Sequence, residues 1–172
     1  MGSQSMRCVT KRCHAKHRDK GVDMKAFVDK LIDITRYNSE EISKRWSKAT
    51  RTNPRTPSYH TIPEDDLIKH AVDFYKNLRA IYYSEKPYGE VTDYFMKYAE
   101  DCFAKEIPLH ESIYALIMMR RHLWLYADFQ KPFLSGLDKE QTVETINRTI
   151  RIFDHGIYLV TKHYNELNAR QV

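Results

Sequence analysis

Hydrophobic positions recur at helical spacing along most of this chain, and the most regular run lies at its carboxyl-terminal end. From about Asp138 onwards, apolar side chains alternate at intervals of three and four residues, at Val143, Ile146, Ile150, Phe153, Ile157, Val160, Tyr164 and Leu167. Such a heptad repeat keeps an apolar stripe on one side of a long helix, where it faces a partner. The pattern predicts a rod-like interaction helix, and a homodimer if part of the stripe packs between subunits.

Apolar stripes and the breaks between them predict five further helices. They start near Asp23, at Ser39, at Pro63, near Tyr88 and at Leu109. Ser39 is predicted to cap its helix, because a hydroxyl accepts from the first free backbone N–H groups of a helix. Proline and acidic residues similarly favour a helix start at Pro63-Glu64-Asp65-Asp66. The expected fold is an all-α, single-domain bundle of about six helices, and a globin-like arrangement is one option.

The predicted helix over 109–130 is apolar around most of its circumference, which places it at the centre of the bundle. At about 100° per residue, Arg120 falls within this apolar arc, beside Trp124. A buried guanidinium must be paired or must face a polar cavity. One interpretation is an ion pair with an acid such as Asp73 or Asp93. The other is a pocket in which Arg120 receives the carboxylate or phosphate of a small ligand.

Composition adds that this is a soluble globular domain, since 42% of the 172 residues are hydrophobic and 30% are charged. No run approaches the roughly 20 apolar residues of a membrane span, and no apolar signal core stands at the start. We therefore expect a cytoplasmic protein that does not enter a membrane.

The net charge of +5 is concentrated in the first residues of the chain. Residues 1–23 hold six Lys or Arg and two Asp, whereas the remaining chain is nearly balanced. Residues 1–22 show no period and are expected to be a disordered basic tail, partly derived from an expression leader because of the start MGSQSM. A nucleic-acid-binding domain carries its positive charge on the folded body, so no nucleic-acid partner is expected for residues 23–172.

Candidate metal ligands are few. Cys8, Cys13, His14 and His17 form C-x4-C-H-x2-H, a weak candidate for zinc and a longer-spaced variant of c-type haem attachment. We favour a tail that happens to hold thiols, and we expect no cofactor. A globin-type haem pocket needs one unpaired His on an apolar face, for which His70 and His122 are candidates, although a structural role is the favoured interpretation. The sequence holds neither a glycine-rich phosphate loop nor a Ser–His–Asp spacing above chance, so no catalysis is expected.

Four segments carry a resemblance to a known family. They are IxxRW from Ile42, NPRTPSY from Asn53, PEDDL from Pro63 and IPLHESIYALIMMRRHLW from Ile107. Over roughly half of the chain, this pattern resembles the amino-terminal domain of RsbRD-type regulators. The resemblance implies a helical, non-catalytic sensory or protein-interaction module that precedes a signalling output in bacterial stress regulators and sensor kinases.

Two functions follow from these patterns. The preferred one is a non-catalytic cytoplasmic sensory or protein-interaction domain of a bacterial signalling pathway, which acts on an output domain or on a separate signalling partner. The alternative is a protein that binds a small ligand or haem in a pocket beside the helix over 109–130, with Arg120, Trp124, His122 and His70 as the candidate residues.

Overall fold

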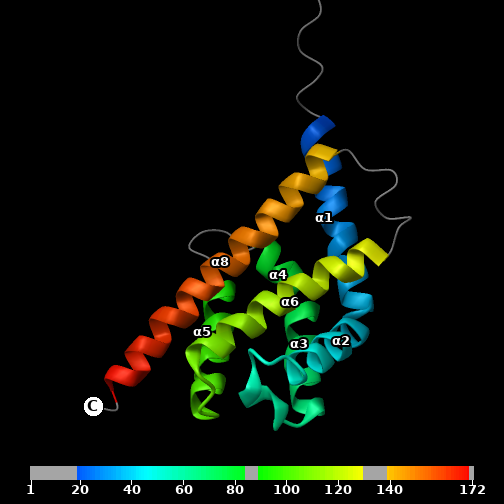
Figure 1. Ribbon diagram of the computed structural model, residues 1–172. Coiled ribbons are helices and arrows are strands. Elements are labelled where there is room, and N and C mark those ends of the chain that lie inside the picture. Colours follow the sequence, from blue (N-terminus) through cyan, green and yellow to red (C-terminus); the bar gives the residue numbers. More distant parts are fainter. Residues whose placement is uncertain (1–18, 84–88, 130–138, 171–172) are drawn as a thin grey trace, which may run out of the picture.

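The computed structural model describes residues 19–83, 89–129 and 139–170, and all regular structure in these ranges is helical (Figure 1). This confirms the predicted all-α bundle. The elements are α1 (Asp19–Tyr37), α2 (Ser39–Arg51), the 3-10 helix η1 (Pro57–His60), α3 (Glu64–Lys76), α4 (Leu78–Tyr83), α5 (Gly89–Ala104), α6 (Leu109–Phe129) and α8 (Lys139–Ala169).

The helix predicted to run on from Pro63 is divided at Asn77 into α3 and α4. The side-chain Nδ2 of Asn77 donates to the carbonyl of Asp73 at 2.9 Å, and its backbone N–H donates to the same oxygen at 3.1 Å. An asparagine that bonds to the local backbone competes with helical hydrogen bonding and ends the helix. The apolar stripe continues across the break because Leu78 and Ile81 face the same core.

Two predicted boundaries are wrong by a few residues. The first helix, α1, begins at Asp19, so residues 19–22 are helical where disorder was expected. The cap of α2 is Asn38, not Ser39, which is instead its first residue and is buried. Asn38 uses its amide to close the preceding helix, because Nδ2 donates to the carbonyl of Ile34 at 2.7 Å.

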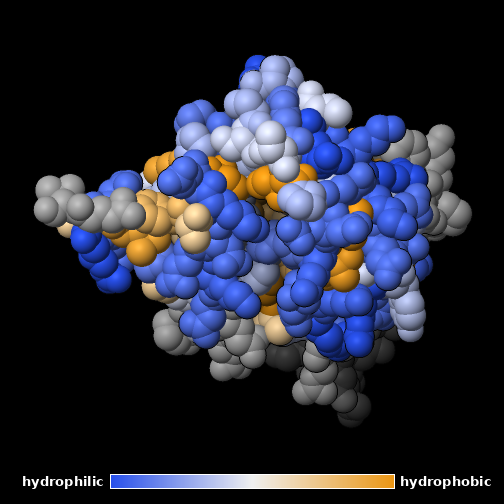
Figure 2. Space-filling view, turned by 90° about the horizontal axis from the view of Figure 1, so that it is seen from below, coloured by the Kyte–Doolittle hydropathy of each residue, from blue (hydrophilic) through white to orange (hydrophobic). Residues whose placement is uncertain are grey.

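Two long helices organise the bundle. The last helix, α8, runs diagonally along the molecule and lies beside α5 and α6 (Figure 1). The helix α6 contacts α1, α2, α5 and α8, in line with the central place predicted for it. On the face seen from below, most residues are hydrophilic and the hydrophobic ones gather in small areas, some set back in a hollow (Figure 2). None of the helices in the described ranges combines the length and the apolar character that a membrane span needs.

An aromatic cluster holds α3, α5 and α8 together. The ring of Phe74 on α3 meets that of Phe153 on α8 edge-on, with the centroids 5.3 Å apart, and Phe95 on α5 lies 6.4 Å from Phe153. All three side chains are fully buried. Edge-to-face pairs of this kind add about 0.5–1.5 kcal/mol each beyond the burial of their area.

The predicted heptad stripe of α8 does not lie on one face of the bundle. Phe153, Val160 and Tyr164 are buried within the same chain, whereas Val143 and Ile150 are 56% and 37% exposed. The other three members, Ile146, Ile157 and Leu167, are half-buried. A straight α-helix rotates by about 20° per heptad relative to a strict seven-residue repeat. Over three heptads this drift turns the start of the stripe outward and its end inward, and Thr145 and Thr149 face the core in its place.

The helices α5 and α8 approach each other closely at Gly156. This glycine is buried, and a Cβ at its position would overlap the ring of Phe95, which is itself fully buried. Because the ring is enclosed on its other sides, it has no space into which to move. Gly156 therefore sets the distance between α5 and α8.

Gly156→Ala is expected to lower the free energy of unfolding, because the added methyl group forces Phe95 or α8 out of place. Overpacking of a core typically costs about 1–3 kcal/mol, which exceeds the gain of at most about 1 kcal/mol from better helix propensity. The matched control is Gly89→Ala, since nothing lies within 4 Å of a Cβ there. Urea denaturation measures both, and an unchanged midpoint for Gly156→Ala would contradict the close approach.

Candidate functional site

A cavity of about 380 Å³ opens between α3 and α5. Its inner walls come from α2, η1, α3 and α5, and they are lined mainly by Trp46, Tyr59, Leu67, His70, Tyr94, Tyr98 and Cys102. On α5, Tyr94, Tyr98 and Cys102 follow one another at intervals of four residues, which places them on one face of the helix. His70 on α3 faces them. The volume lies within the range of ordinary small-molecule sites.

His70 is stacked against two tyrosines of α5. Its ring centroid lies 5.1 Å from that of Tyr98 and 5.8 Å from that of Tyr94, with interplanar angles of 30° and 26°. Its Nε2 contacts the hydroxyl of Tyr94 at 3.1 Å. Although His70 borders the cavity and is only half-buried, desolvation lowers the pKa of its imidazole to about 4. The ring is therefore uncharged at neutral pH.

The inner end of the cavity holds a directed chain of hydrogen bonds. The hydroxyl of Tyr98 donates to the backbone carbonyl of Ser112 at 2.8 Å. Having one hydrogen, Tyr98 must accept at the 3.0 Å contact with Tyr59, so Tyr59 donates there. The Cys102 thiol lies 3.7 Å from the Tyr59 oxygen. Because Tyr59 already donates its hydrogen to Tyr98, the thiol donates to Tyr59. Burial raises the pKa of Tyr59, Tyr98 and Cys102, so all three groups keep their protons.

Ser112 also contacts α8, through its side-chain hydroxyl and not through the backbone carbonyl that accepts from Tyr98. The hydroxyl of Ser112, at the start of α6, lies 2.9 Å from the hydroxyl of Tyr164 on α8. Tyr164 in turn donates to the carbonyl of Ile107 at 3.1 Å, and Ile107 also lines the cavity. A set of buried polar groups thus connects η1 and α5, which line the cavity, with the last helix.

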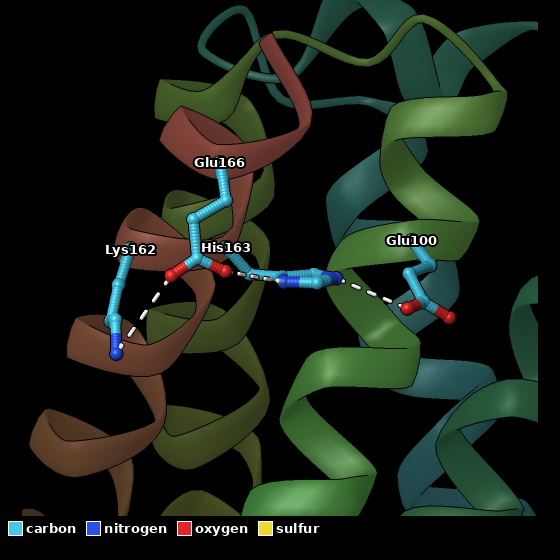
Figure 3. A network of polar contacts seen from close by, with 4 residues as sticks. All are labelled: Glu100, Lys162, His163 and Glu166. Carbon is cyan, nitrogen blue, oxygen red and sulfur yellow. Dashed lines mark hydrogen bonds and ion pairs between the residues drawn. The ribbon is translucent and has the colours of Figure 1, made fainter. Parts of the chain in front are cut away.

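Next to Tyr164, a second polar cluster ties α8 to α5 (Figure 3). The buried ring of His163 lies between two carboxylates, with Nε2 3.1 Å from Glu100 of α5 and Nδ1 3.3 Å from Glu166 of its own helix. Lys162 approaches Glu166 at 3.8 Å. The contact between His163 and Glu100 therefore holds the end of α8 against α5.

The wall formed by η1 is anchored to α6. The buried carboxylate of Glu111 accepts from the backbone N–H of Ser58 at 2.8 Å and from its hydroxyl at 3.1 Å. Trp46 of α2 donates from Nε1 to the carbonyl of Ala115 at 3.0 Å. These bonds hold α2 and η1, the other two walls of the cavity, against α6.

Of the predicted ligand-binding residues, His70 alone lines this cavity. Arg120 pairs with Asp154 of α8 at 3.2 Å, instead of with Asp73 or Asp93. His122 contacts the carbonyl of Met118 through Nδ1 at 2.8 Å. Trp124 is half-buried, and its Nε1 has no hydrogen-bond partner. The cavity therefore lies beside α5 and α3, and not beside α6 as predicted from the apolar arc around Arg120.

The candidate metal ligands Cys8, Cys13, His14 and His17 lie outside the described residues. Within residues 19–83, 89–129 and 139–170, no group of three or more His, Cys, Asp or Glu side chains is placed to hold a metal ion.

The tyrosines of the pocket do not stand out in the sequence, because Tyr is common in helix cores, where its ring packs and its hydroxyl finds one partner. A signal was present in the four-residue spacing of Tyr94, Tyr98 and Cys102. That spacing alone does not distinguish a pocket wall from core packing, since both place rings on one helix face.

No protein-family model matches this chain, and no curated protein and no solved structure matches it either. The class defined by the fold is an all-α helical bundle. The resemblance to the RsbRD-type domain stays a prediction.

The lowered pKa of His70 predicts a specific pH dependence. Between about pH 4 and the ordinary value of 6.5, the unfolded chain binds a proton that the folded protein does not. The free energy of unfolding should therefore be highest above pH 6.5 and fall as the pH drops towards 4, by up to about 1.4 kcal/mol per pH unit from this group.

His70→Phe, which keeps a flat ring but cannot titrate, should flatten this part of the stability profile in urea denaturation at several pH values. His110→Phe, which changes an exposed histidine outside the cavity, is the matched control. An identical slope for the unmodified protein and His70→Phe would show that His70 is not desolvated.

Arg120→Met is expected to lower the free energy of unfolding by less than about 1 kcal/mol, because the partner Asp154 is 63% exposed and water screens the pair. A fully buried pair would cost about 3–5 kcal/mol when broken. Asp154→Asn is the matched variant and should have a similarly small effect. Chemical denaturation of both variants decides between the two magnitudes.

Proposed function

We propose that this chain is a non-catalytic sensory domain of a bacterial signalling pathway, in which a small molecule occupies the cavity between α3 and α5 and α8 transmits its presence. The cytoplasm is the proposed location. The proposal joins both functions expected from the sequence, since it assigns the ligand to the pocket and the protein interaction to the last helix.

The observation that carries the proposal is that Ser112 joins two sets of buried hydrogen bonds. Its backbone carbonyl accepts from Tyr98, which contacts Tyr59 in the pocket, and its side-chain hydroxyl contacts Tyr164 of α8. A ligand that displaces Tyr98 removes its hydroxyl from the carbonyl of Ser112, and a ligand that displaces Tyr59 removes the donor to Tyr98. A buried polar group that loses a partner typically costs about 1–3 kcal/mol. The neighbouring groups, including Tyr164, then rearrange to satisfy it. Occupancy of the pocket thereby changes how α8 is held.

The first half of α8 supplies the surface that would bind a signalling partner. Val143 and Ile150 are exposed apolar side chains on this half, in the part of the predicted stripe that turns away from the core. Exposed apolar residues in line on a long helix favour a protein partner. A second copy of the chain, as in the predicted homodimer, and a separate signalling protein both fit this surface. Light scattering of the unmodified protein distinguishes a monomer from a dimer.

Coupling between pocket and α8 is tested by a double-mutant cycle with Tyr98→Phe and Tyr164→Phe. Each change removes one hydroxyl from the buried chain and keeps the ring. If the two groups act through Ser112, their effects on the free energy of unfolding should deviate from additivity by about 0.5–3 kcal/mol. Urea denaturation of the single and double variants gives this value.

The matched control pairs Tyr98→Phe with Tyr82→Phe. Tyr82 is buried and contacts Thr149 of α8, but it belongs to α4 and to a separate set of hydrogen bonds. These two changes should be additive within about 0.5 kcal/mol. Additive effects in both cycles would mean that the pocket has no polar connection to α8, and the proposed function would be wrong.

A further inference from the structure

We infer that the cavity between α3 and α5 takes a small, planar aromatic molecule without net charge. This inference rests on the proposed function and deepens it by naming the chemical class of the ligand. It replaces the expectation of an anionic ligand held by Arg120, whose guanidinium is paired with Asp154 on another side of the bundle.

The walls of the cavity present flat rings. His70 and Tyr98 are stacked at 5.1 Å, and Tyr94 lies on the same side of α5 with its ring 26° from that of His70. Trp46 and Tyr59 add two further rings from α2 and η1. Aromatic rings prefer offset-stacked or edge-on neighbours, and such a pair is worth about 0.5–1.5 kcal/mol beyond its buried area. A planar ring system extends this stack, whereas an aliphatic ligand of equal volume does not.

The deep end of the cavity offers no hydrogen-bond donor for an anion. The donors of Trp46, Tyr59 and Tyr98 are already used on Ala115, Tyr98 and Ser112. The remaining polar pair, His70 and Tyr94, shares one hydrogen bond. Desolvation lowers the pKa of His70 and raises the pKa of Tyr94, so both are uncharged at neutral pH. This pair suits one neutral hydroxyl or ring nitrogen of a ligand. A charged group placed here would lose its water without gaining a partner, which is strongly unfavourable.

Charged side chains stand at the mouth, and their signs balance. The exposed residues that border the cavity include three aspartates and three lysines, namely Asp66, Asp73, Asp101, Lys69, Lys97 and Lys105. Equal numbers of both signs give no net field that draws an anion or a cation inward. No arginine is found among the described residues that line the cavity, so the planar fork that suits phosphate and carboxylate groups is missing there.

Four matched probes test the ligand class on the full chain. They are 2-naphthol, 2-naphthoate, 2-(aminomethyl)naphthalene and decahydro-2-naphthol, which vary the charge and the aromaticity around one carbon skeleton. In calorimetric titration at neutral pH, 2-naphthol should bind about tenfold more tightly than either charged analogue, because of the desolvation of charge. It should bind about three- to tenfold more tightly than the saturated analogue, because of ring stacking.

Variants locate the binding. Tyr94→Leu removes one ring of the stack and should weaken 2-naphthol by about three- to tenfold while leaving the saturated analogue unchanged. Tyr158→Leu is the control, since this ring is 61% exposed on α8 and lies outside the cavity. Ile62→Trp fills the cavity from a half-buried loop position, leaves the helices intact, and should abolish the binding of all four probes.

Binding of 2-naphthoate or the amine as tight as that of 2-naphthol would overturn the claim that the ligand is uncharged. Equal binding of the saturated analogue would overturn the aromatic claim, and so would the absence of binding by 2-naphthol. The proposed function is judged separately, by amide hydrogen exchange over residues 157–169. If 2-naphthol binds in the cavity but exchange there is unchanged, the ligand class stands and the sensory role is wrong.

Discussion

The close approach of α5 and α8 is the constraint on which the rest of the structure depends. Gly156 lets the ring of Phe95 lie directly on the backbone of α8. This contact brings Phe153 into the aromatic cluster with Phe74 of α3, and it sets the position of α5 relative to α3. Since α3 and α5 form the two main walls of the cavity, the packing of Phe95 against Gly156 contributes to the position of those walls.

The same contact places polar groups where they connect distant parts of the chain. Further along α8, Tyr164 reaches Ser112, and His163 reaches Glu100 of α5. Buried polar groups of this kind contribute little net stability, because each exchanges a bond to water for a bond within the protein. Their value lies in defining one arrangement, since any displacement leaves a buried group unsatisfied.

The side chains inside the pocket are neutral, whereas those at its mouth are charged. Inside, burial keeps tyrosine, cysteine and histidine side chains in their neutral forms, and hydrogen bonds among them replace ion pairs. Outside, aspartates and lysines alternate around the mouth and stay in water. For the ligand proposed above, such a site offers shape and aromatic contact more than charge.

The sequence by itself determined the helical class and the main helices, because a 3.6-residue period of apolar side chains is a local property that needs no knowledge of the partner. The heptad pattern of α8 was also correctly read as a long helix. Which face of that helix meets the core was decided by the tertiary structure, since the twist of a straight helix turns Val143 outward and Tyr164 inward. The tertiary structure also decided the partner of Arg120. This residue stood out in the sequence, yet its partner Asp154 lies 34 residues away on another helix. Tyr59, His70 and Tyr98 became one pocket only when α3, α5 and η1 were packed together, because no local pattern states which helix faces are neighbours.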